Sequence, residues 1–329
     1  MSLRWSFARH AIVFAVFVTP LLAAASAPEQ TYPSRRIVIV VPYTPGSGFD
    51  IVARNVGQKI AERWGQPVVV DNKTGASSTI GTEAVVNAEA DGYTVMVTGS
   101  PLTVSPALSK SLRYDPVAGL TPLGTVGASG LALTVNSAAL PIRSLADFLA
   151  ETKAKPGKFN YSSPGTGTLQ HVGMELLKQQ LGFDAVHVPY RGASIALTDL
   201  LTGQVQFSLL PVHTALPHVQ SGQLRMIAIA GATRTPFAPD VPSFAELAHP
   251  GLNFDLWYGF FGPANLSMSV VQKWENELAA IIELPDVKDN FRTQGQVPGF
   301  RDAAATGALV KSEIARWRAV VEKAGIKPE

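Results

Sequence analysis

The sequence predicts an α/β protein of two lobes, each built around a mostly parallel β-sheet. Three observations support this prediction. The chain has 329 residues, about twice the usual length of one domain. Hydrophobic residues make up 46% of it and charged residues 16%, which provides material for a buried core. Segments rich in β-branched residues alternate with segments of helical periodicity, a pattern typical of parallel sheets covered by helices.

The first 27 residues have the pattern of a signal peptide. Arg4 and Arg9 precede an apolar run from Ala11 to Val18, and a stretch of small residues ends at Ala27. The alternative, a membrane anchor, is disfavoured because the run is shorter than the roughly 20 residues that a span needs. We therefore expect export to the periplasm, with cleavage near Ala27.

Charge and cysteine content exclude several classes of protein. Loss of residues 1–27 removes two arginines and no acid, which takes the formal charge from +2 to 0. A nucleic-acid partner therefore has no basic surface to bind. The chain has no cysteine, so it has no disulfide, thiolate metal site or cysteine nucleophile.

The first strand and helix are predicted directly after this segment. Arg36 to Tyr43 is a β-branched run of the kind found in buried parallel strands. A turn from Thr44 to Gly48 follows. Apolar residues at spacings of three and four then predict a helix that ends at Gly65; they are Phe49, Val52, Val56, Ile60 and Trp64.

The same alternation recurs twice. A second unit has a strand at Val68–Val70, a joint at Asp71–Ser78, a helix through Ile80 to Ala88 and a strand at Tyr93–Thr98. A third unit has a strand at Phe159–Ser162, a joint at Ser163–Thr168 and a helix from Leu169 to Leu181, ended by Gly182. A strand at Val186–Pro189, a helix at Ser194–Leu201 and a strand at Val205–Leu210 continue the series.

Two crossovers between lobes are predicted. The short residues of Gly124–Gly130 precede a strand at Leu131–Val135, and the return lies near Leu224–Gly231. We therefore expect lobe 1 to comprise residues 28–126 and 232–329, and lobe 2 residues 127–231. In this division the proline-rich segment 234–242 and a final helix at Gly307–Ala324 complete lobe 1.

Several strand-to-helix joints are rich in glycine, serine and threonine, which indicates an anion site. Helix N-termini carry unpaired N–H groups and a partial positive charge, so a carboxylate binds there without a basic side chain. Such joints lie at the carboxyl ends of parallel strands, where ligands bind. The alternative for any single joint is ordinary capping, and capping is our default for Asp50. Ser163–Thr168 has three hydroxyls and two glycines, more than one cap needs.

No motif in the sequence indicates catalysis or a cofactor. Neither GxxxxGK[ST] nor GxGxxG is present, so a nucleotide cofactor is not expected. His171 and Glu175 are one helical turn apart, but no second cluster completes a metal site. No serine elbow of the GxSxG type serves the histidines. We expect a protein that is not an enzyme and has no cofactor or metal. Trp257 and Tyr258 are predicted to lie in a strand-like run, Asn253–Phe261, as a pocket wall or as core.

Seven segments carry a resemblance to a known family, and they span nearly the whole chain after residue 27. The chain resembles the Bug family, the TctC-like substrate-binding receptors of tripartite tricarboxylate transporters. The matching segments are PYTPGSGFDIVAR (42–54), VVVDNKTGASSTIGTEAV (68–85), ADGYTV (90–95), YSSPGTGTLQHVGMELL (161–177), VPYRGASIALTDLLTGQV (188–205), PDVPSFAE (239–246) and WYGFFGPA (257–264).

This resemblance implies a type II periplasmic-binding-protein fold with a central ligand cleft. It implies a monomeric solute-binding protein that takes a small carboxylate, such as a dicarboxylate, amino acid or aromatic acid, to the membrane subunits of a transporter. A receptor for a sensor kinase is the alternative, and a secreted hydrolase on this fold is a weaker one. The ligand-binding residues that we predict from the joints, the resemblance and the aromatic run are Tyr43, Ser47, Asp50, Ser77, Ser78, Ser163, Thr166, Gly167, Thr168, His171, Asp199 and Trp257.

The chain departs from the family pattern at three places. Gly46-Ser47 stands where Gly-Gly is usual, and Gly75-Ala76-Ser77-Ser78 stands where Gly-Ala-Gly-Gly is usual. Gln206 replaces a frequent acidic residue. The added side chains narrow the backbone approach or supply hydroxyl donors, so we expect a ligand other than the commoner dicarboxylates.

Overall fold

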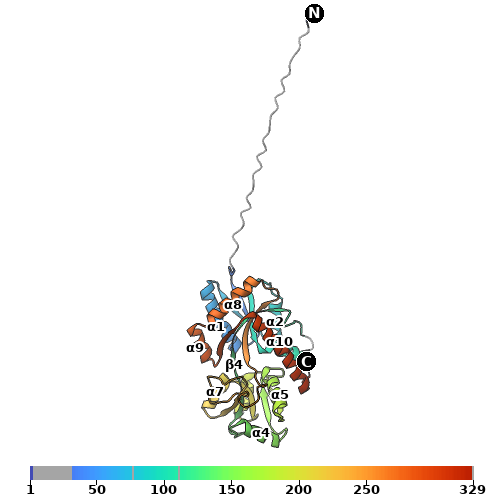
Figure 1. Cartoon of the computed structure of the whole chain (residues 1–329), viewed down its shortest axis with the longest axis vertical. Coiled ribbons are helices and arrows are strands. Elements are labelled where there is room, and N and C mark those ends of the chain that lie inside the picture. The colour runs from blue at the N-terminus through green and yellow to red at the C-terminus, as the bar shows by residue number, and fades with distance from the viewer. Residues whose placement is uncertain (3–31, 76–77, 110–111, 328–329) are drawn as a thin grey trace. The chain divides into compact units, whose positions relative to one another are not determined.

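A computed structural model describes residues 1–2, 32–75, 78–109 and 112–327 of the chain. Apart from its first two residues, the predicted signal peptide lies outside the described residues, as does Ser77 of the predicted site. From Pro33 onward the chain forms one body, which contains two sheets and the helices that flank them (Figure 1). Among the described residues, no helix combines the length and apolar character needed to cross a membrane.

The first sheet has six strands in the order β11-β4-β10-β3-β1-β2. β1, β2 and β3 are parallel, whereas β10 runs antiparallel to both β3 and β4. The strands are β1 (Ile37–Val41), β2 (Val68–Asn72), β3 (Thr94–Gly99), β4 (Leu120–Ser129), β10 (Leu256–Pro263) and β11 (Val297–Arg301). The helices that accompany the first sheet are α1 (Gly48–Trp64), α2 (Thr79–Val86), α3 (Ser100–Leu108), α8 (Met268–Ile282), α9 (Pro285–Thr293) and α10 (Ala303–Ala324).

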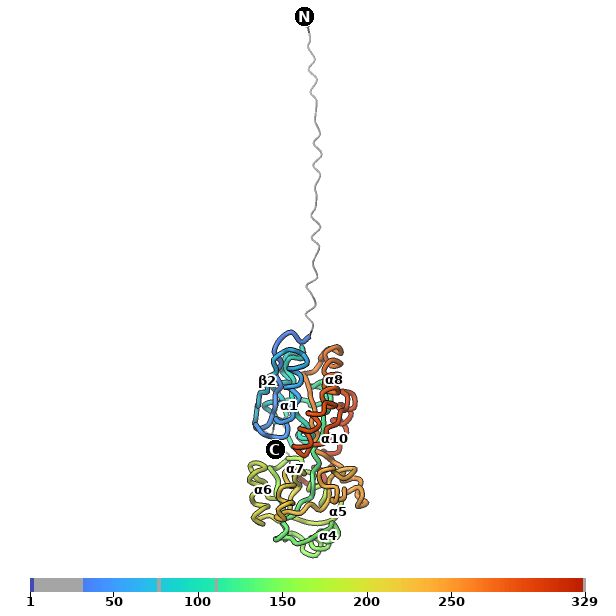
Figure 2. The backbone as a smooth tube through the Cα atoms, turned by 90° about the vertical axis from the view of Figure 1, so that its left-hand side faces the viewer, coloured from blue at the N-terminus to red at the C-terminus, as the bar shows by residue number. Residues whose placement is uncertain are grey.

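The second sheet has five strands in the order β7-β6-β8-β5-β9. β6 is parallel to β7 and β8, and β5 is antiparallel to β8 and β9. The strands are β5 (Leu131–Asn136), β6 (Asn160–Ser163), β7 (Val186–Pro189), β8 (Phe207–Pro211) and β9 (Leu224–Ile229). The helices are α4 (Leu145–Ala154), α5 (Leu169–Leu181), α6 (Ala193–Leu201) and α7 (Val212–Gln220), grouped around this sheet in Figures 1 and 2.

The predicted strand–helix units are confirmed in their type and order. α1 and α5 bury the apolar stripes expected from their spacing. Gly65 and Gly182 end these helices in the left-handed conformation, which glycine adopts without steric cost. The predicted crossover segment Gly124–Gly130 is different: all but its last residue belongs to β4. The sequence pattern did not predict α3, α4, α7, α8, α9 or β11.

The carboxyl ends of the parallel strands in the two sheets meet at one crossover. β4 has the direction of β3, because both strands are antiparallel to β10. After β4 ends at Ser129, the single residue Gly130 leads directly into β5 of the second sheet. Leu131, the first residue of β5, pairs with Pro211 at the end of β8. The joints after β1, β2 and β3 therefore lie on an edge that meets the edge holding the joints after β6, β7 and β8.

The return passage, from β9 to β10, packs with the second sheet before it reaches the first. Ser243 forms a bridge with Ile229 of β9, and Phe244 and Phe254 are buried in the hydrophobic cluster that contains β5 and β8 residues. Val320 and Val321 of α10 lie in the same cluster. The predicted lobe boundary at residues 126 and 127 falls inside β4. The exact division into lobes stays a prediction.

Candidate functional site

The joint between β1 and α1 is held by a network around the Asp50 carboxylate. Ser47 is the N-cap of α1, and its hydroxyl accepts a hydrogen bond from the Asp50 N–H (3.3 Å). In return, Asp50 accepts from the Gly46 N–H (2.9 Å), in a variant of the capping box. Arg54 forms an ion pair with Asp50 at 3.0 Å, and the Asn72 amide donates to it at 3.0 Å. The N-cap of α1 is thus Ser47, and Asp50 supports the cap from the first turn and pairs with Arg54.

These contacts keep Asp50 ionised although it is buried. Burial alone raises the pKa of this carboxyl, but hydrogen bonds from Arg54, Gly46 and Asn72 outweigh burial and hold the pKa below its usual value. The negative charge of Asp50 is balanced by Arg54 next to it. The first turn of α1 is therefore already occupied by a paired carboxylate.

Tyr43 connects the first joint with the second. Its hydroxyl shares a hydrogen bond with Thr98 at the end of β3 (3.0 Å), and its backbone carbonyl accepts from the Asn72 amide (3.1 Å). Burial raises the pKa of Tyr43 well above its usual value, and the hydroxyls of Thr98 and Ser78 offset part of that rise. Three neighbouring joints of the first sheet thus meet at the Tyr43 hydroxyl.

The joint between β6 and α5 repeats the capping geometry with a neutral side chain. Thr168 is the N-cap, and its hydroxyl accepts from the His171 N–H (3.4 Å). The Gly167 N–H donates to Nδ1 of His171 (3.0 Å), so the neutral ring carries its proton on Nε2. Gly167 has φ +82°, and a Cβ there would lie 2.8 Å from Leu108 of α3, so this position requires glycine. Thr166 is exposed at the tip of the joint.

Two stacked imidazoles lie behind this joint. The rings of His171 and His187 are 3.9 Å apart and nearly parallel, and Ser163 bonds Nε2 of His187 at 2.7 Å. Burial, followed by the neighbouring His171 and Lys178, lowers the pKa of His187 to about 3. Burial also lowers the pKa of His171. Both rings are therefore neutral at physiological pH.

The Ser163–His187 pair does not form a nucleophilic site. Ser163 is fully buried and also donates to the Gly165 carbonyl (3.0 Å). Within residues 32–75, 78–109 and 112–327, no carboxylate bonds the second nitrogen of His187, so the orienting acid of a catalytic triad is missing. In the same ranges no group of three or more histidine, aspartate or glutamate side chains could hold a metal ion.

The joint between β7 and α6 adds residues that the sequence prediction did not include. The Tyr190 hydroxyl donates to Asp199 (2.6 Å), and the Tyr190 N–H donates to the Ser163 carbonyl (3.0 Å), which ties this joint to the preceding one. Burial first, then Asp199, raises the pKa of Tyr190 to about 12. Asp199 thus orients Tyr190. Arg191, the next residue, is exposed and forms no ion pair among the described residues.

Helices other than α1 and α5 at these two edges begin without a side-chain cap. Ser78, the N-cap of α2, has φ 77° and accepts no capping bond through its hydroxyl. Gly192 and Pro211, the N-caps of α6 and α7, provide none either, and nor does Gly99 before α3. The first-turn N–H groups of these helices therefore lack the side-chain partner that α1 and α5 have.

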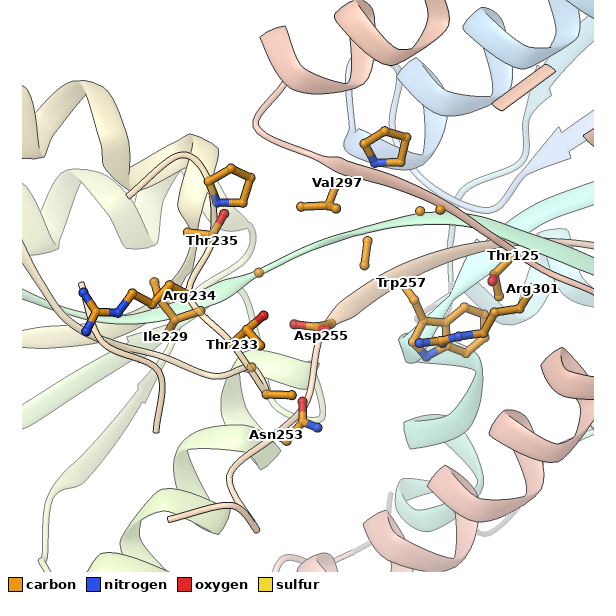
Figure 3. A pocket seen from close by; sticks show the side chains of 18 of the residues that line it. Thr125, Ile229, Thr233, Arg234, Thr235, Asn253, Asp255, Trp257, Val297 and Arg301 are labelled. Atoms are coloured by element: carbon orange, nitrogen blue, oxygen red, sulfur yellow. The ribbon is translucent and has the colours of Figure 1, made fainter. Parts of the chain in front are cut away.

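Trp257 is placed apart from the joints. Its neighbour Tyr258 packs against Phe49 of α1, and consecutive strand residues point to opposite faces. Trp257 accordingly faces Glu313 of α10, to which its indole N–H donates at 2.9 Å. Its side chain also lines a cavity at the two crossovers, shown in Figure 3. The structure thus brings Tyr43, Ser47, Asp50 and Ser78 together, and Ser163, Thr166, Gly167, Thr168 and His171 together.

Comparison with known proteins identifies similar chains. The model of the tripartite tricarboxylate transporter family receptor (TctC) matches residues 52–326. Protein BugT of Bordetella pertussis is 32% identical over 317 residues, which cover 96% of this chain and 97% of BugT.

Three solved structures resemble the chain closely. An R. palustris protein described with adipate is 29% identical, covers 91% of this chain and all of its own, and has a TM-score of 0.80. MatC from Rhodopseudomonas palustris, described with bound malate, is 28% identical, covers 88% of this chain and all of its own, and has a TM-score of 0.76. The structure of the periplasmic binding protein BugD is 27% identical, covers 91% of this chain and all of its own, and has a TM-score of 0.78; with the strand order above, it confirms the predicted two-sheet periplasmic-binding-protein fold.

Proposed function

Because the chain belongs to the tripartite tricarboxylate transporter receptor family, we propose that it captures a small carboxylate and delivers it to the membrane subunits of such a transporter. Members of this family are periplasmic binding receptors, and the chain is a receptor rather than an enzyme. The ligand class and the membrane partner are the parts that we propose here.

One observation carries the proposal of a carboxylate ligand. The helix N-termini of both sheets lie on edges that meet at the crossover through Gly130. Each helix start presents N–H donors and a partial positive charge, which favour an anion. The uncapped starts of α2, α6 and α7 keep their donors available for a ligand. A negative ligand between the two edges gains hydrogen bonds from both lobes, which favours the closed state.

The chemistry of the ligand follows from the charges around these joints. The charge of Arg54 is balanced by Asp50, so the first joint offers an acid group mainly neutral donors. Arg191 is an exposed cation in the joint between β7 and α6. Two similar structures are described with adipate and with malate. Each of these acids has two carboxyl groups on a short chain. We propose that one carboxylate of the ligand binds at the joints and that Arg191 attracts the remaining charge.

The predicted site is retained as part of this proposal. Thr166, Gly167 and His171 supply groups from the second sheet, and Tyr43 and Ser78 supply groups from the first. Ser47, Asp50, Ser163, Thr168 and Asp199 already have partners in the structure, so we propose that they shape the joints as well as contact the ligand. We also propose export by the leader, with cleavage near Ala27, and the lobe division given above.

A thermal-shift screen tests the function. The mature protein is heated with adipate, malate and other mono- and dicarboxylates, amino acids and aromatic acids. Binding of any of them raises the free energy of unfolding by RT ln(1 + [L]/Kd), and the melting temperature rises with it. Isothermal titration then gives the Kd of the acid with the largest shift. A library in which no acid raises the melting temperature contradicts the proposal, and mass spectrometry of the exported protein checks the cleavage position.

A further inference from the structure

A cavity that is partly open to solvent lies at the passages between the sheets, away from the joints. It has a volume of about 450 Å³ and is walled by β4, by β11 and by the connection from β9 to β10 (Figure 3). This volume is within the range of small-molecule sites, roughly 300–1,000 Å³. Apolar walls come from Ile229, Trp257, Val297 and Phe300. We call it the hinge cavity.

Asp255 places an unpaired carboxylate in the hinge cavity. Its side chain points toward Thr233 on the opposite wall (Figure 3). In the described part of the chain, no side chain or backbone N–H donates a hydrogen bond to this carboxylate, and no lysine or arginine forms an ion pair with it. Burial raises the pKa of Asp255 to about 6, with Arg301 lowering it and Glu313 raising it further. At neutral pH the group is therefore charged and lacks a partner.

Among the described residues, the arginines of the cavity wall form no ion pair with this carboxylate. Arg234 is held by both oxygens of Glu246 and by the Pro239 carbonyl. Arg301 is exposed, and its positive charge lowers the pKa of Asp255 without offsetting the rise that burial causes. A half-buried carboxylate without a bonded partner is costly, and a cation that reaches it lowers that cost. The aromatic and aliphatic walls suit a short apolar body attached to the cation.

We propose that the hinge cavity binds a small organic cation, an ammonium group on a short apolar body, with Asp255 as its counter-charge. This site is separate from the proposed carboxylate site, because Trp257 faces the hinge cavity while Tyr258 faces the start of α1. The proposal does not depend on which acid the receptor transports.

Butylammonium is the probe, and butyrate, with a body of equal length and opposite charge, is its control. Binding is followed by the indole N–H signal of Trp257, assigned as the signal that disappears in Trp257→Phe, and by calorimetry. We expect a saturable shift with butylammonium and none with butyrate. Asp255→Asn should weaken butylammonium binding at least tenfold, whereas Asp240→Asn, an exposed acid on the same connection, should leave it unchanged.

A second variant and a pH series separate the cavity from a general charge effect. Gly231→Ala keeps the Asp255 charge but places a methyl group 3.8 Å from its Oδ1, so it should also weaken binding. Binding should fall between pH 7 and pH 5 as Asp255 takes up a proton. Asp255→Asn removes a half-buried, unpaired charge, so the variant is expected to fold. An unshifted Trp257 signal, equal binding by Asp255→Asn, or equal binding of butyrate overturns the proposal.

Discussion

The starts of α1 and α5 have the same backbone plan but opposite electrostatics. In both, a hydroxyl N-cap accepts from the N–H three residues on, and that third residue accepts from the glycine before the cap. The third residue is Asp50 in α1 and His171 in α5. One turn later, Asp50 meets Arg54, whereas His171 is followed by Glu175. The joint before α1 is thus closed by its own ion pair, and the joint before α5 keeps its N-terminal positive potential for a ligand.

His171→Asp is expected to have the largest effect, because it gives α5 the acid of α1 without its arginine. A like charge about 5 Å from the bound carboxylate costs about 3 kcal/mol at an effective dielectric constant of 20, or roughly a hundredfold in affinity. Titration calorimetry with the best acid from the screen measures the loss. His171→Asn, which can still accept from Gly167, should stay within a few fold of the wild type. Equal losses in both variants would show that the charge of residue 171 is not what matters.

The histidine pair predicts a loss of stability in mild acid. The folded pKa of His187, about 3, lies below its usual 6.5, so between these values the unfolded chain binds more protons. The free energy of unfolding has its full value above pH 6.5. It decreases as the pH falls, by about 2 kcal/mol at pH 5. Urea unfolding at pH 7 and pH 5 measures this difference. His187→Gln should lose less between the two pH values, and parallel losses would contradict the assignment.

The ion pair of the first joint predicts acid sensitivity in a lower range. The folded pKa of Asp50 is depressed, so its stabilisation is present above its usual value of 3.8 and is lost as the pH falls through the folded pKa. Asp50→Asn should cost about 1–2 kcal/mol at pH 7, because charge-assisted hydrogen bonds are lost. Melting temperatures at pH 7 and pH 3 test this, with Asp184→Asn, an exposed acid, as control. A cost that is unchanged at pH 3 would be inconsistent with the ion pair.

Loss of the two N-cap hydroxyls is expected to have the smallest effects on stability, and the two losses should be similar in size. Ser47→Ala and Thr168→Ala each remove one capping bond and should each cost about 1 kcal/mol in urea unfolding. If these hydroxyls also contact the ligand, as the site prediction states, each variant in addition weakens acid binding. A stability loss with unchanged affinity would restrict Ser47 and Thr168 to capping.

The sequence was sufficient to predict the parts of the fold that depend on local pattern. α1 and α5 were predictable because their apolar residues have helical spacing and a glycine ends each helix. β4 was less visible, because Gly124 and Gly127 resemble a loop. Their positive φ angles and the backbone of β11 that packs on them explain the glycines, and that packing is a long-range contact.

The strand-to-helix joints of the candidate site were predictable, but the side chains that contact them were less so. Hydroxyls and glycines at strand ends identified the joints around Ser47 and Thr168. His187 was not selected, although it approaches Ser163 through the parallel register of β6 and β7, which only the pairing of strands reveals. Trp257 was predicted as a pocket residue from its neighbours in the chain, yet strand alternation directs it to the hinge cavity. No sequence pattern pointed to Asp255, because its lack of a hydrogen-bond or ion-pair partner depends on which residues the fold brings around it.

The passages between the sheets are attached to one another as well as to the sheets. The Ala230 N–H donates to the Leu131 carbonyl (2.7 Å), and β5 and β9 continue the ladder beyond them. Two connections bonded side by side resist shear and independent twisting, so a rotation of one sheet must bend both together. Any opening of this receptor would then follow a single path. A molecule bound beside the two connections would change how far the two sheets rotate apart.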